Sequence, residues 1–176
     1  MVADELGAIA SNVDVEADHM EFEIPEHYLF EPGSSNPSAQ FVNIMSKIQA
    51  ITVGLEDSRV DVDSIVYQES IPEGNDAAQR VSANRKDLVG LKIKSSFEHD
   101  TNEIFGSATV KVAGPGRKAP ESSVKIRISQ KETLSSGRKP RPLEDLFQAD
   151  RNKDLDVYND FVRRVSQDKN KSKSKK

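Results

Sequence analysis

The chain has 176 residues, of which 29 are acidic and 25 are basic, and it contains no cysteine. The absence of cysteine excludes disulfide bonds, thiolate catalysis and cysteine-ligated zinc. Apolar residues make up 35% of the chain, a fraction that suits one domain with polar tails. The acidic start and the absence of a long apolar run lead us to expect a soluble, intracellular protein, cytoplasmic or nuclear.

Charge is sorted along the sequence. Residues 1–83 hold 16 acidic and 3 basic residues, whereas residues 84–142 hold 13 basic and 6 acidic ones. The last eight residues, 169–176, hold five lysines and no acid. Because a basic segment concentrates anions near its surface, the pattern predicts that the chain binds an anionic partner or its own acidic half.

The elements of the amino-terminal half follow from turn residues and hydrophobic spacing. Residues 1–19 are small and acidic, which predicts a flexible arm ahead of a single domain over 20–166. Glu21–Ile24 alternates and suits a short strand. Apolar residues spaced by three and four predict an amphipathic helix over 38–53. Alternation then predicts a strand over 59–70, and a short helix over 76–86 is weakly indicated.

Three further alternating segments, 88–98, 103–113 and 122–132, predict strands joined by short loops. Short connections favour an antiparallel meander. A proline-containing linker and a carboxy-terminal helix over 143–166 complete the domain, and a basic, disordered tail occupies 167–176. The sequence therefore predicts an α+β fold, with an antiparallel sheet of about four strands and helices packed on it.

Successive side chains of a strand point to opposite faces, and the three last predicted strands place cations on the outer one. The loop and linker beside them add more. The candidate binding residues are Lys92, Lys94, Phe105, Lys111, Arg117, Lys118, Lys125, Arg127, Arg138, Lys139 and Arg141. Cations neutralise phosphates and an aromatic ring stacks on a base, so we expect a non-enzymatic protein that binds RNA or DNA.

Other interpretations of the same residues remain open. Asp61, Asp63 and Glu69 share a strand face and could neutralise the cations within the chain. A structural self-assembly protein, such as a viral matrix or coat component, could form a homo-oligomer by contact between acidic and basic halves. The lysines of Lys169–Lys176 could also bind an anionic membrane surface.

The sequence supports no catalytic residue, metal site, cofactor or small-molecule substrate. Residues 150–161 resemble a calcium loop in part, but Leu155 replaces the glycine that makes its turn and Phe161 replaces its bidentate glutamate. His19 and His27 have acidic neighbours and could hold a metal only if they were rigidly supported. We therefore expect no enzymatic activity.

Overall fold

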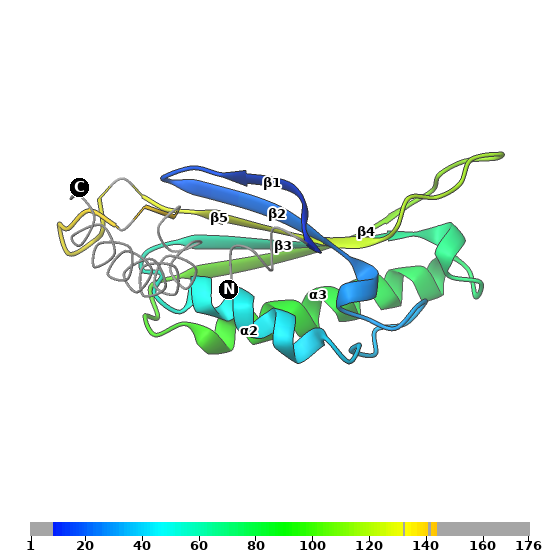
Figure 1. Cartoon of the computed structure of the whole chain (residues 1–176), viewed down its shortest axis with the longest axis horizontal. Helices are drawn as coiled ribbons and strands as arrows, with labels where there is room; N and C mark the ends of the chain where they lie inside the picture. Colours follow the sequence, from blue (N-terminus) through cyan, green and yellow to red (C-terminus); the bar gives the residue numbers. More distant parts are fainter. Residues whose placement is uncertain (1–8, 132, 141, 144–176) are drawn as a thin grey trace, which may run out of the picture.

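The computed structural model describes residues 9–131, 133–140, 142 and 143, which form a five-stranded sheet with two α-helices on one face (Figure 1). The elements are β1 (Ser11–Val15), β2 (His19–Pro25), the 3-10 turn η1 (Glu26–Tyr28), α2 (Phe41–Thr52), β3 (Arg59–Tyr67), the 3-10 turn η2 (Gln68–Ser70), α3 (Asn75–Ser96), β4 (Glu103–Lys111) and β5 (Ser123–Ser129). The predicted α+β class is confirmed.

The strand order is β1-β2-β5-β3-β4. β3 and β4 are parallel, and the other neighbouring pairs are antiparallel. Parallel neighbours need a crossover, which α3 provides between β3 and β4. The predicted meander was therefore wrong: β5 lies between β2 and β3 rather than beside β4. The segment 112–122, which joins β4 to β5, extends beyond the sheet as an arm (Figure 1).

Helix α2 confirms the predicted amphipathic helix. Its buried positions repeat at spacings of three and four, so one stripe faces the sheet. Its buried residues are Phe41, Ile44, Met45, Ile48, Ile51 and Thr52. Side-chain bonds fix α2 against α3: Gln49 donates to the carbonyl of Lys92 at 2.7 Å, and the hydroxyls of Thr52 and Ser96 lie 2.7 Å apart.

The strand predicted over 88–98 was wrong, because residues 75–96 form one helix, α3. The sheet-facing positions of α3 are Ala78, Ser82, Arg85, Val89 and Ile93, at spacings of four and three. Two of these five are polar, which hides the helical period from a hydrophobicity pattern. The segment seemed to alternate because Leu91 lies between the core residues Val89 and Ile93. Leu91 itself is 67% exposed and does not belong to the core.

The strands predicted over 59–70, 103–113 and 122–132 are present as β3, β4 and β5. Residues 1–19 were predicted to be a flexible arm, but this range contains β1, which pairs with β2 through an irregular register. The predicted carboxy-terminal helix over 143–166 and the tail over 167–176 lie outside the described residues, apart from Leu143. Leu143 is fully buried, and its amide donates to the carbonyl of Ala17 at 2.8 Å.

The core lies between the helices and the inward side chains of β2, β3 and β5. Met20, Phe22 and Ile24 of β2 face it beside Val124, Ile126 and Ile128 of β5. Val60 and Val62 of β3 continue the layer. The opposite sheet face, termed the open face, carries no helix in the described chain (Figure 1).

Replacement of Ile48 by alanine should lower the free energy of unfolding by about 2–5 kcal/mol, because Ile48 is fully buried in the core. Val42 lies on the same helix but is 68% exposed, so Val42→Ala should change stability by less than about 0.5 kcal/mol. Urea unfolding of both variants measures the difference. Equal effects would show that α2 does not bury the assigned stripe.

Candidate functional site

The predicted nucleic-acid-binding residues do not form one surface. Lys125 and Arg127 on β5, and Phe105 and Lys111 on β4, lie on the open face as predicted. Lys92 and Lys94 belong to α3, which covers the other face, because their segment is helical rather than extended. Arg117 and Lys118 lie on the 112–122 arm, Arg138 and Lys139 lie beside a cleft described below, and Arg141 lies outside the described residues.

Carboxylates alternate with the cations across the open face. Asp61 and Asp63 of β3 stand opposite Arg127 and Lys125 of β5, and Glu21 of β2 flanks the same cations on the other side. The Nε of Arg127 donates to Glu21 Oε1 at 2.8 Å, and Lys125 Nζ lies 3.5 Å from Glu21 Oε2. The hydrogen bond from Arg127 lowers the pKa of Glu21 and raises that of Arg127. The cations are thus paired within the chain.

One face of the Phe105 ring is covered by a cation of the same chain. The Arg59 guanidinium lies 4.1 Å from the centre of the Phe105 ring, and it also donates to Asp61.

Glu69, the third acid that the sequence offered as a neutralising group, binds backbone amides instead. Its carboxylate accepts hydrogen bonds from the amides of Ala113 and Gly114, at 2.9 and 3.3 Å, and so fixes the base of the arm.

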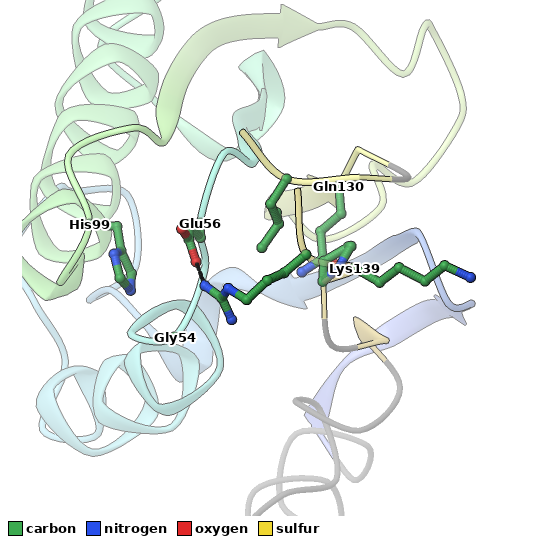
Figure 2. Close-up of a pocket in the computed structure, with 8 residues that line it drawn as sticks. Gly54, Glu56, His99, Gln130 and Lys139 are labelled. Carbon is green, nitrogen blue, oxygen red and sulfur yellow. Dashed lines mark hydrogen bonds and ion pairs between the residues drawn. The ribbon is translucent and has the colours of Figure 1, made fainter. Parts of the chain in front are cut away.

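A small cleft lies at the other end of the sheet, between the segments that follow α2, α3 and β5 (Figure 2). This cleft has a volume of about 190 Å³. It is lined by Gly54, Glu56, His99, Gln130, Leu134, Arg138, Lys139 and Pro140. An Arg138 nitrogen donates to Glu56 at 2.8 Å, and Lys139 extends away from Glu56 (Figure 2).

Local hydrogen bonds hold the cleft wall. The carboxylate of Asp57 accepts a bond from the Ser135 amide at 2.6 Å, and this bond lowers the pKa of Asp57. Leu134 is buried, and its amide donates to the Arg138 carbonyl at 2.8 Å. The side-chain oxygen of Gln130 is buried without a hydrogen-bond partner among the described residues. The cleft therefore offers both signs of charge and an apolar side.

A buried ion pair lies at the opposite end of the sheet. Arg85 of α3 is the largest fully buried side chain, with 1% exposure, and its guanidinium lies 2.9 Å from Glu26. Its Nε donates to the carbonyl of Ser34 at 2.9 Å, and the group lies 5.0 Å from the Phe30 ring centre. Burial lowers the pKa of Arg85, and Glu26 opposes that effect. Sequence reasoning missed this residue, because nothing local distinguishes Arg85 from an exposed arginine.

His19, the first residue of β2, lies among carboxylates of β1 and of the turn that joins the two strands. Its Nε2 is 2.8 Å from Glu16 and 3.4 Å from Asp14, and its Nδ1 is 3.2 Å from Asp18. These groups are largely solvated, as expected for an exposed ion cluster. His27 instead contacts the Glu121 carboxylate, so the two histidines considered as metal ligands lie in separate clusters.

No known protein family and no curated protein matches this chain by sequence. Solved structures do match the fold. The periplasmic domain of Helicobacter pylori MotB, residues 97–256, aligns with a TM-score of 0.54 and 16% identity over 69% of this chain and 89% of that domain. A putative MotB-like protein from Desulfovibrio vulgaris aligns with a TM-score of 0.53 and 11% identity, over 72% of this chain and 84% of that one.

The cell wall anchor of the T6SS from Pseudomonas aeruginosa aligns with a TM-score of 0.50 and 18% identity, over 74% of this chain and 94% of that one. The fold is therefore similar to that of MotB periplasmic domains and of this cell wall anchor. Within the part of the chain that the structure describes, no helix is long and apolar enough to cross a membrane.

These neighbours contradict the functional predictions made from charge. Nucleic-acid binding, a viral matrix or coat role, and a cytoplasmic or nuclear location were wrong, because the fold is shared with periplasmic domains and a cell wall anchor. Head-to-tail association of acidic and basic halves was wrong too. Both halves contribute strands to one sheet, where their charges meet within a single chain.

Replacement of Arg85 by methionine should cost about 3 kcal/mol or more of unfolding free energy, because it leaves Glu26 partly buried without its cation. Arg80→Met, at an exposed position of the same helix, is the matched control and should be close to neutral. Urea unfolding compares the two. A loss no larger than that of the control would contradict a structural role for the ion pair.

The pKa of His19 should lie above 6.5, chiefly because of its bond to Asp18. A raised folded-state pKa means that protonated His19 stabilises the fold fully below the unfolded-state pKa, and that this contribution disappears as pH rises through the folded-state value. Titration of the imidazole by NMR should show a lower midpoint for Asp18→Asn. Asp100→Asn, in a distant loop, is the control, and an equal midpoint in all three proteins would refute the assignment.

Proposed function

We propose that this chain is a non-enzymatic anchoring domain of the bacterial cell envelope that binds peptidoglycan. The observation that carries the proposal is the shared fold. The described sheet and helices align with almost the whole of a cell wall anchor, 94% of its length, and with 89% of a MotB periplasmic domain. A match over most of a neighbour means that the common part is a complete domain rather than one shared motif.

The chemistry of the chain is compatible with such a ligand. Peptidoglycan consists of glycan strands carrying short peptides, which present carboxylates and amino groups together. The cleft of Figure 2 offers cations in Arg138 and Lys139 and a carboxylate in Glu56. Groups of both signs around one small concavity suit a zwitterionic peptide end better than a uniformly anionic polymer. We therefore assign the cleft as the contact region.

The open face supports the same conclusion by exclusion. Lys125 and Arg127 are already paired with Glu21, and they stand opposite Asp63 and Asp61 in the sheet, so neither is free to neutralise a phosphate backbone. A neutral, polar and solvated sheet face is common in antiparallel sheets that pack on one side only. The composition of the open face can therefore be explained without a ligand bound to it.

Co-sedimentation of the full chain with purified peptidoglycan sacculi at physiological salt tests the proposal. The chain should pellet with sacculi but not with chitin, which has a related glycan backbone and lacks the peptides. Labelled RNA and DNA at the same salt should remain unbound. Failure of the full chain to pellet with sacculi would overturn the proposed function.

A matched pair of double variants tests the place of contact. Arg138→Ala with Lys139→Ala removes two adjacent cations from the cleft, whereas Arg117→Ala with Lys118→Ala removes two adjacent cations from the arm. The first should weaken sacculus binding about tenfold, as expected for loss of charge-assisted hydrogen bonds, and the second should leave it unchanged. Equal weakening would indicate non-specific attraction and would remove the cleft from the proposal.

A further inference from the structure

The two edges of the sheet differ in how they are protected. At one edge β1 has five residues, an irregular register and an asparagine, Asn12, with a φ of 53°. Short, irregular edge strands resist pairing with another chain. At the other edge β4 has nine residues in an unbroken register with β3. No strand pairs with its outer side in the part of the chain that the structure describes.

The free edge is exposed along its length. Glu103, Phe105, Gly106, Ser107 and Ala108 are exposed, and no residue of β4 is buried. The strand contains no proline and no bulge. A row of unpaired backbone groups in a regular strand of this length is a template for a further strand.

An apolar groove adjoins the same edge. It runs between α3 and β4 and has a volume of about 310 Å³. Leu91 of α3, with an exposed fraction of 67%, lines it together with Ile104 and Gly106 of β4. Phe105, which is 43% exposed, lies on the open face of the same edge strand. Gly106 lets the Lys86 side chain pack directly over β4, because the aliphatic part of Lys86 would lie 2.7 Å from a Cβ at that position. Exposed apolar groups beside an unpaired strand indicate that both are covered together.

The sequence of β4 is complementary to itself in one antiparallel register. When Ser107 faces Ser107 of a second copy, Glu103 faces Lys111 at both ends of the strand, and Ile104 faces Val110 on the helix side. Gly106 then faces Ala108, a pair of small residues. A shift of two residues in either direction keeps the same faces together but separates Glu103 from Lys111, so the charges select this register.

We propose that two copies of this chain pair antiparallel through β4, about a two-fold axis at Ser107, and form one continuous ten-stranded sheet. The contact is isologous and closes after two copies, because each partner uses the same strand. It differs from the rejected head-to-tail association, since the acidic and basic residues that meet both belong to β4. It does not depend on the proposed peptidoglycan ligand.

Single-cysteine variants of the full chain test the register, because the natural sequence has no cysteine. In the proposed dimer the two Ser107 residues lie opposite each other, with Cα atoms about 4.5–5.5 Å apart, which a disulfide can span. Ser107→Cys should therefore form a covalent dimer under mild oxidation. Thr109→Cys is the control: the two substituted residues would lie roughly 14 Å apart along the strands, so this variant should form no covalent dimer.

Charge exchange tests the same contact without oxidation. Glu103→Lys and Lys111→Glu should each raise the dimer dissociation constant about tenfold, because each change turns two attractive cross-strand pairs into repulsive ones. The double variant should restore dimerisation. Analytical ultracentrifugation measures association, and thermal unfolding of each variant checks that the fold is intact.

Several results would overturn the proposal. A full chain that stays monomeric at high micromolar concentration would do so, as would a dimer in which Ser107→Cys fails to cross-link while Thr109→Cys succeeds. Failure of the double variant to recover, when its thermal unfolding matches that of the parent chain, would also refute the register. None of these results decides whether the chain binds sacculi, which is measured separately.

Discussion

The position of β5 between β2 and β3 determines most of what this sheet presents to solvent. β5 comes from the basic part of the sequence, and both of its neighbours come from the acidic part. Each outward cation of β5 therefore stands between carboxylates, as Arg127 does between Glu21 and Asp61. The charge asymmetry along the sequence becomes alternation across the sheet, where neighbouring charges lie close enough to pair. The same strand supplies Ile126 and Ile128 to the core.

The parallel pairing of β3 with β4 has equally wide consequences. It requires a crossover, and the crossover helix α3 must then cross the sheet with one face buried. Arg85 occupies a central position on that face and is held by Glu26 and by the carbonyl of Ser34. Breaking such a buried pair costs more than the pair itself contributes, since it leaves an uncompensated charge. Arg85 thus ties the loop after η1 to α3 and gives this end of the molecule a defined shape.

The accuracy of the sequence predictions depended on how each element buries its residues. Elements whose inner face is mostly apolar were recognised: α2 through Ile44, Ile48 and Ile51, and β3 and β5 through strict alternation. The carboxy-terminal half of α3 was mistaken for a strand, because Ser82 and Arg85 interrupt its apolar stripe and Leu91 mimics alternation. The strand order could not be predicted from the sequence. Short connections normally join neighbouring strands, whereas the 112–122 arm joins β4 to β5, and β3 lies between them.

The site was less accessible to sequence reasoning than the fold. Arg138 and Lys139 were selected for their charge alone, but their surroundings come from three segments far apart in sequence, represented by Glu56, His99 and Gln130. Only the fold brings these together. Selection by charge also favoured Lys125 and Arg127, whose partners in β2 and β3 could not be assigned without the strand order. The number of cations in a segment predicts an anionic ligand only when the carboxylates that pair with those cations in the fold are also known.

The proposed anchoring function places a physical demand on the molecule that bears on its two unequal edges. A domain that holds a polymeric lattice through one small cleft gains little affinity from that cleft, since the contact area is limited. Two clefts held rigidly in one dimer convert the second contact into an intramolecular event at high effective concentration. Pairing through β4 would leave both clefts free, because the cleft is built from the segments after α2, α3 and β5 and from no residue of β4. The protected edge at β1 would end the sheet on each side, so that assembly stops at two copies.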